Sequence, residues 1–164
     1  MNDEKGQLSG EYMLLVGSLI VVLMISIFMI ANENELNIAM AAAKSGVDEG
    51  VASSSSAIYP KETFNEYDDM EGLKHPYSVS IVNVSYNSSG IDENYGKQKI
   101  QFKVYAKASV DYNKKELDSI GDRINYNLRK SVATSFNTTD STNKLYNPVF
   151  SNNYVFTTAN VVWV

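Results

Sequence analysis

The chain has 164 residues, of which 44% are hydrophobic and 20% are charged, so its size permits one small domain plus one additional element. A net charge of −5, with no dense block of Lys or Arg, argues against a nucleic-acid-binding surface, because binding to phosphates needs clustered positive charge. The absence of cysteine excludes disulfides, thiolate metal sites and thiol catalysis.

The residues that precede the first apolar run follow a distinctive pattern. Lys5 and Gly6 are followed by Gln-Leu-Ser-Gly-Glu-Tyr at positions 7–12. This stretch resembles the class III signal peptide of archaeal type IV pilins, whose pattern is Gln-x-Ser-x-Glu-Phe/Tyr. The resemblance covers residues 5–58 and says little about the rest of the chain. The residues that match the signal motif are Gln7, Ser9, Glu11 and Tyr12.

The resemblance implies that a prepilin peptidase cuts between Gly6 and Gln7, which removes residues 1–6 as a leader and leaves the apolar run on the mature protein. Gly6 has no side chain to obstruct the protease, and Lys5 marks the cytoplasmic side of the membrane. The family further implies a membrane-bound precursor, which the pilus assembly platform and its ATPase build into an extracellular helical homopolymer on the cell surface.

The apolar run itself extends from Tyr12 to Asn32 without a charged residue. As a helix it would span about 30 Å, the thickness of the hydrocarbon core of a bilayer. A cleaved secretory signal would be shorter, and a cleavage-like sequence at 39–41 lies beyond a polar stretch. A single-span anchor fits the composition but does not explain Glu11 at the edge of the run. A third use is a helix that first lies in the membrane and later packs against copies of itself.

Glu11 has two physical explanations. Cleavage would give Gln7 a free α-amine, and the Glu11 carboxylate of a neighbouring copy could pair with it during assembly. Such an ion pair at about 4 Å, with an effective dielectric constant near 20, contributes about 4 kcal/mol. This roughly cancels the cost of burying the charge, so the pair fixes the axial register of the subunits more than it adds stability. Alternatively, a carboxylate in the first helical turn interacts favourably with the helix dipole and needs no partner.

Beyond the apolar run, small and apolar residues at spacings of three and four predict that the helix continues. The Ser-rich stretch 53–56 and the pair Tyr59-Pro60 predict its end, so we expect one hydrophobic membrane and assembly helix over 7–58. Gly46 and Gly50 should weaken it by about 1 kcal/mol each. The narrow predicted face consists of Leu36, Ala39, Met40, Ala43, Val47 and Val51.

A head domain is predicted over residues 59–164. Its first part, 60–76, is acidic and is predicted to be a surface loop. Within it, the pair Asp68-Asp69 lacks the oxygen spacing of a calcium site, and the lone His75 has no partner typical of a metal or catalytic site. Two strands are expected, over 77–86, with a loop from Asn87 to Gly90, and over 100–112, where apolar and polar residues alternate strictly. An amphipathic helix over 114–135 and a closing strand over 154–164 complete an α+β fold whose sheet we expect to be antiparallel.

The sequence contains no constellation typical of an enzyme. Its Ser and Asp residues lack a His partner, Gly-rich phosphate loops are absent, and the carboxylates are scattered. We therefore expect no catalytic residues, no cofactor and no metal. The head does carry N-glycosylation sequons, although no more than composition gives by chance. The candidate glycan sites are Asn83, Asn87 and Asn137.

These observations favour a structural subunit of an archaeal type IV pilus that mediates surface adhesion. A minor pilin shares every motif, whereas an archaeal flagellin would share the long helix but lack the Gln-x-Ser-x-Glu pattern. The alternative from another class is a membrane-anchored surface binding protein whose helix is only a tether. The mature N-terminus separates these classes, because Gln7 supports a pilin and Met1 supports a tether.

Overall fold

The computed structural model describes residues 3–52 and 78–164, with side chains from Gly10 onward. The predicted helix end at 53–58, the domain boundary at 59 and the acidic loop at 60–76 lie outside the described residues. The chain divides into two compact units, residues 1–37 and 38–164. Helix α1 (Asp3–Ala52) is continuous and contributes to both units.

The second unit contains a five-stranded sheet, so the predicted α+β class is confirmed. Its central path has the order β1-β2-β4-β3, and β5 pairs with β2 beyond the end of β4. β1 pairs antiparallel with β2 and β3 with β4, but β2 pairs in parallel with both β4 and β5, so the sheet is mixed rather than purely antiparallel. The strands are β1 (Val79–Asp92), β2 (Lys97–Ala108), β3 (Val149–Phe150), β4 (Tyr154–Thr158) and β5 (Val162–Trp163).

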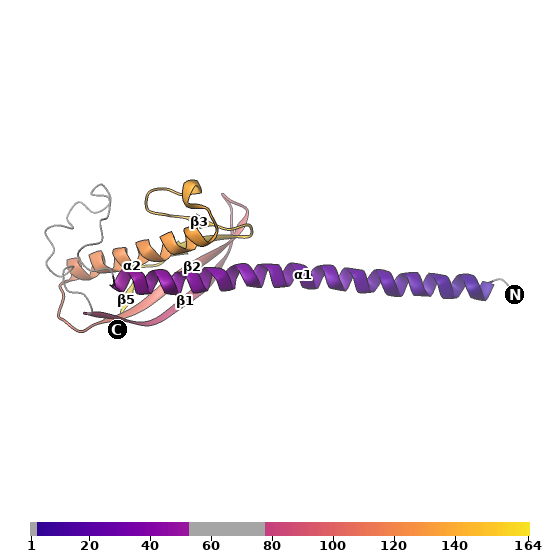
Figure 1. Ribbon diagram of the computed structural model, residues 1–164, viewed down its shortest axis with the longest axis horizontal. Helices are drawn as coiled ribbons and strands as arrows, with labels where there is room; N and C mark the ends of the chain where they lie inside the picture. The colour runs from indigo at the N-terminus through magenta and orange to yellow at the C-terminus, as the bar shows by residue number, and fades with distance from the viewer. Residues whose placement is uncertain (1–2, 53–77) are drawn as a thin grey trace. The chain divides into compact units, whose positions relative to one another are not determined.

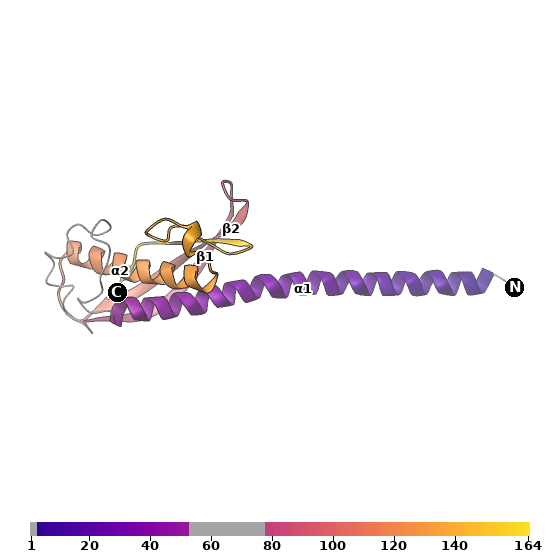
Figure 2. The same cartoon turned by 45° about the horizontal axis from the view of Figure 1, so that its top comes forward.

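The parallel pairing follows from the position of the second helix, α2 (Lys114–Ser135), which lies between β2 and β4 in the sequence. A strand that follows such a crossover can align in parallel with the strand before it, whereas a tight hairpin can only give antiparallel neighbours. Figures 1 and 2 show α2 packed over the sheet beside the C-terminal end of α1.

The alternation predicted for the second strand is confirmed. Ile100, Phe102, Val104 and Ala106 are buried, and the strand ends at Ala108, four residues before the predicted end. The stacked rings of Phe102 and Phe156, with centroids 5.7 Å apart, join β2 to β4. The predicted closing strand is interrupted at 159–161, which separates β4 from β5.

The predicted loop at 87–90 is wrong, because β1 continues to Asp92. Asn87 pairs with Gln101 and Ser88 with Ile100 before a register shift admits Gly90, whose φ is 82°. Backbone pairing with the long β2 thus overrides the low strand propensity of these polar residues.

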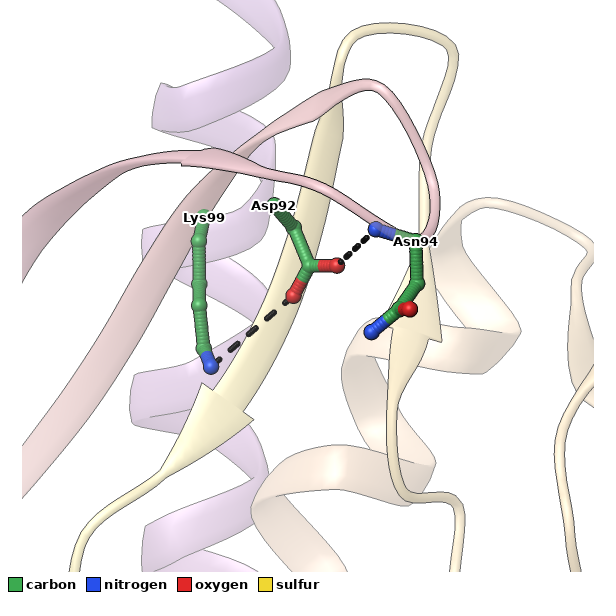
Figure 3. A network of polar contacts seen from close by, with 3 residues as sticks. All are labelled: Asp92, Asn94 and Lys99. Carbon is green, nitrogen blue, oxygen red and sulfur yellow. Dashed lines mark hydrogen bonds and ion pairs between the residues drawn. The ribbon is translucent and has the colours of Figure 1, made fainter.

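The hairpin turn lies instead at 93–96, where Asp92 organises the backbone (Figure 3). The Asn94 amide donates to Asp92 Oδ1 at 3.0 Å, and the Gly96 amide donates to the Asp92 carbonyl oxygen at 2.8 Å. Gly96 has a φ of 63°, which glycine adopts without steric cost. Lys99 Nζ lies 3.8 Å from Asp92 Oδ2. One oxygen of the carboxylate therefore contacts the turn and the other contacts a lysine of β2.

Helix α2 has the bounds that the sequence predicts, and both of its ends carry recognisable caps. Asn113 and Glu116 form a capping box at the N-terminus. At the C-terminus, Asn137 has a φ of 53° and the Thr138 amide donates to the Ala133 carbonyl oxygen at 2.9 Å, which is a Schellman motif. The buried face of α2 includes Ile120, Ile124, Leu128 and Val132.

The C-terminal end of α1 packs closely against α2 through small residues. Ala39, Ala43 and Val47 of the predicted face are buried, and so are Gly46 and Gly50. A Cβ atom on Gly46 would lie 2.5 Å from the Asn127 carbonyl oxygen, and one on Gly50 would lie 2.9 Å from the Ile124 Cα atom. These glycines therefore do more than weaken the helix, because they let the two backbones approach each other.

We expect Gly46→Ala to destabilise the second unit by about 1–3 kcal/mol, since the added methyl group collides with backbone atoms of α2. In an open helical position the same change would stabilise by about 1 kcal/mol. Thermal unfolding of the full chain in detergent, followed by the fluorescence of the single tryptophan, measures the effect. Ser45→Ala, at an exposed neighbouring position, is the control. An unchanged or higher melting temperature for Gly46→Ala would contradict the close helix contact.

Candidate functional site

The first unit presents an apolar helix that the chain itself leaves uncovered. Apart from Val16, which is partly covered, the large apolar side chains from Tyr12 to Ile30 are each at least half exposed, and Leu14 reaches 77%. By length and composition, the part of α1 from Gly10 onward can cross a membrane, and its most apolar stretch is not buried by the chain. A helix that is apolar on all sides is stable only in a bilayer or inside a larger assembly.

The two serine hydroxyls within this apolar stretch are satisfied by the helix. Ser18 Oγ donates to the Leu15 carbonyl oxygen and Ser26 Oγ to the Val22 carbonyl oxygen, both at 2.8 Å. Hydroxyl groups that bond back to the preceding turn can enter hydrocarbon or an apolar interface without losing a hydrogen bond. The serines therefore do not oppose burial of this segment.

The predicted signal residues all lie on one short stretch of α1. The backbone of Gly6, Gln7 and Ser9 is helical, and their side chains lie outside the described part. Glu11 and Tyr12 are exposed. Because α1 begins at Asp3, Glu11 lies beyond the first helical turn of the full-length chain. The helix-dipole explanation therefore applies only to a chain shortened to Gln7, since the dipole acts mainly within the first turn.

The candidate glycan sites are all exposed, but they do not lie together. Asn83 and Asn87 lie on the edge strand β1 within a regular part of its ladder, so their even spacing puts them on one face. Asn137 is instead the left-handed residue that ends α2. Its capping role was missed in the sequence, although an Asn directly after a helical pattern is a recognised end signal.

The chain was also compared with protein-family models, with curated proteins and with solved structures, and none of the three comparisons found a match. No family is therefore assigned through a relative. The function of the chain is inferred from its own apolar helix and from the motif at 7–12.

Asn137 is both a candidate glycan site and the residue that ends α2, and two variants can separate these roles. If a glycan is attached there in the native host, Asn137→Gln and Thr139→Ala should both remove the same glycan mass, because either change destroys the sequon. Only Asn137→Gln should also destabilise the end of α2, by about 1–2 kcal/mol, since Gln is strained at positive φ. Mass spectrometry measures the loss of the glycan, and thermal unfolding measures stability. Asn83→Gln, on a regular strand, is the control for stability. An unchanged mass for Thr139→Ala would remove Asn137 as a glycan site.

Proposed function

We propose that the chain is a structural subunit of an archaeal type IV pilus, which polymerises through its N-terminal helix into an extracellular filament for surface adhesion. The observation that carries this proposal is the exposed apolar helix from Tyr12 to Ile30, which directly follows the Gln-x-Ser-x-Glu motif and continues into a folded head. The motif would direct cleavage before the helix, so the helix stays available for assembly.

The energetics of the helix favour two successive environments. Covering one large apolar side chain contributes roughly 1.5–3 kcal/mol, so an uncovered helix of this length would not stay dispersed in water. A bilayer covers it in the precursor, and neighbouring copies of the same helix cover it in a filament. The same apolar surface can contact lipid or neighbouring helices, because the apolar side chains surround the whole helix.

Glu11 supports assembly rather than simple anchoring. A carboxylate beside hydrocarbon is costly, and a plain anchor gains nothing from it. Pairing with the α-amine of a neighbouring Gln7 would offset that cost only when the subunit occupies the correct axial position. The carboxylate would therefore reject misaligned subunits.

The head is suited to the outer surface of such a filament, because residues 38–164 have a core of their own. Its buried side chains include Phe102, Ile124, Leu128 and Phe156. Any glycans at the exposed sequons would project from this unit. Among the described residues, no group of His, Asp or Glu could hold a metal ion.

The apolar span taken alone also favours a second candidate, a membrane-anchored surface binding protein. In that case the leader would remain and the mature chain would begin at Met1. A minor pilin or an archaeal flagellin-like subunit would instead begin at Gln7 and enter a filament.

Processing provides the first test. We expect Gly6→Val to leave an uncleaved precursor in the membrane, because a branched side chain at the scissile position obstructs the prepilin peptidase. The mass of the purified chain reports cleavage. Gly10→Ala is the matched control, since its surroundings are open and it occupies a variable position of the motif. Normal maturation of Gly6→Val would refute the assigned cleavage site.

Assembly provides the second test. We expect Glu11→Gln to remain cleavable and membrane-inserted, yet to form few or no filaments, because the charge that fixes the incoming subunit is lost. Electron microscopy of cell surfaces, together with the mass of the membrane-retained chain, measures both properties. Glu33→Gln, another exposed acid on α1, is the control. Abundant normal filaments from Glu11→Gln would show that register comes from helix packing alone.

A further inference from the structure

The side of β2 that faces away from the core carries a row of lysines. The even-numbered side chains of β2 are buried from 100 to 106, whereas the odd-numbered ones from 97 to 107 are partly or fully exposed. Successive side chains of a strand point to opposite faces of a sheet, so these odd-numbered side chains share one face. This set, which we call the lysine face, consists of Lys97, Lys99, Gln101, Lys103, Tyr105 and Lys107.

The helices lie on the other side of the sheet. Phe136, at the end of α2, stacks on Phe156 of β4 with ring centroids 5.8 Å apart, and Phe156 pairs with Ile100 of the buried row. Figure 3 shows the Lys99 side chain in front of the strands and α1 behind them. In the described part of the chain, the lysine face is therefore left open by both helices.

The lysine face has one sign of charge, although the net charge of the chain is −5. The five strands contain four lysines and a single acid, Asp92, at the end of β1. The other polar residues that pair with the lysine face on β1 and β4 are neutral. They are Ser80, Asn83, Ser85, Asn87 and Thr157. The sheet thus gathers positive charge that the sequence spreads over alternate positions.

Two lysines at one end of the row are engaged within the head. Lys99 Nζ lies 3.8 Å from Asp92 Oδ2, so its charge is partly offset. Lys97 Nζ donates a hydrogen bond to the Ser151 carbonyl oxygen. These contacts hold the hairpin end of β2 and leave the other end of the row for a different role.

The two lysines at that other end have no acidic partner among the described residues. Lys103 and Lys107 form no ion pair with a described Asp or Glu. Lys103 Nζ lies 5.2 Å from the centre of the Tyr105 ring, and this cation–π contact holds the ammonium group close to the sheet. Lys107 is exposed. Both ammonium groups are therefore open to an anionic partner.

The usual reasons for lysine on a sheet do not explain this row. Lysine on an edge strand prevents strand addition, but β2 is central, with β1 on one side and β4 and β5 on the other. Solubility is served by interspersed charges of both signs, and lysine is depleted in strands. A row of one sign on a central strand is explained better by a negatively charged partner.

We propose that the lysine face binds a linear polysaccharide that carries carboxylate groups. Lys103 and Lys107 are about 13 Å apart along the strand, so one extended chain with repeated charges can contact both. The amide group of Gln101, on the same face, can exchange hydrogen bonds with sugar hydroxyls.

The chemistry of the lysine face favours a polysaccharide over a nucleic acid. The face has no arginine, whose planar fork matches phosphate groups. Single-stranded nucleic acids need aromatic rings on which successive bases stack, and the lysine face offers only Tyr105, whose ring is already in contact with Lys103. Lysine ammonium groups act as separate point charges, which suits carboxylates spaced along a polymer.

This inference deepens the proposed function, because such a polysaccharide would be the surface to which the filament adheres. Residues 38–52 of α1 lie beside α2, on the side of the sheet opposite the lysine face (Figures 1 and 2). With α1 in the core of a filament, the lysine face would point outward. Only this last step rests on the proposed function.

Binding to the isolated chain provides the test. We would titrate the full chain in nonionic detergent with alginate oligosaccharides, in which every sugar carries a carboxylate, and follow the heat of binding and the backbone amide NMR signals. The chain is made without glycans, because Asn83 and Asn87 border the lysine face. We expect saturable binding that weakens at higher ionic strength and shifts the signals of β2 rather than those of α2. Dextran oligosaccharides, which lack the charge, and oligothymidylate, both of matched length, are the ligand controls.

Variants then locate the binding site. Lys103→Gln and Lys107→Gln should each weaken alginate binding about two- to fivefold, because each removes one exposed ion pair. The double variant should weaken binding further, whereas Lys103→Arg keeps the charge and should bind as the original chain does. Lys130→Gln, at an exposed lysine of α2, is the matched control and should leave the affinity unchanged.

Several results would overturn the proposal. These are an absence of saturable binding, equal binding of dextran, and equal losses of affinity in Lys130→Gln and in the lysine-face variants. Tighter binding of oligothymidylate than of alginate would also overturn it, because the face would then belong to a nucleic-acid site.

Filaments separate failure of this inference from failure of the proposed function. Alginate binding in detergent requires no filament, so its absence would refute the polysaccharide site alone. A chain that binds alginate but never forms filaments would keep the site and refute the proposed function. Filaments of the original chain should bind alginate-coated beads, and filaments of the double variant should lose this binding. Equal bead binding by both filaments would refute adhesion through the lysine face.

Discussion

The structure depends first on the need to cover residues 12–30 of α1. Their apolar side chains surround the whole helix and are exposed, and the hydroxyls of Ser18 and Ser26 are bonded to the helix backbone. The charged residues nearest to this segment are Glu11 before it and Glu33 after it. The stability of this helix is therefore set by what covers it, which we propose to be first lipid and then other subunits.

The same helix changes its mode of packing near residue 38. Residues 12–30 carry large apolar side chains that the chain leaves mostly exposed, whereas from Ala39 onward the buried face consists of small residues. Gly46 and Gly50 bring α1 and α2 so close that a Cβ atom would not fit. Close backbone contact stabilises through many weak dispersion interactions, which compensate for the low helix propensity of glycine. The helix thereby becomes part of the core of the second unit rather than a tether to it.

Local signals in the sequence predicted the parts of the fold that are set locally. The bounds of α2 follow from its apolar periodicity, and the burial of β2 follows from its alternation. The polar stretch at 87–90 was misread because its strand state depends on pairing with β2, and the parallel pairing of β2 with β4 depends on a crossover. The signal motif is contiguous and readable, whereas the close contact of α1 with α2 at Gly46 and Gly50 joins segments far apart in the sequence and needs the folded chain.

The acidic side chains of the chain separate into two kinds. Asp92 is completed within the head, because it accepts from the Asn94 amide and lies 3.8 Å from Lys99 Nζ. Glu11 forms no ion pair with a described Lys or Arg residue. Glu11 borders an apolar helix that the chain itself leaves uncovered. Since a carboxylate beside hydrocarbon costs free energy, we propose that Glu11 is retained because another copy of the chain supplies a cation for it.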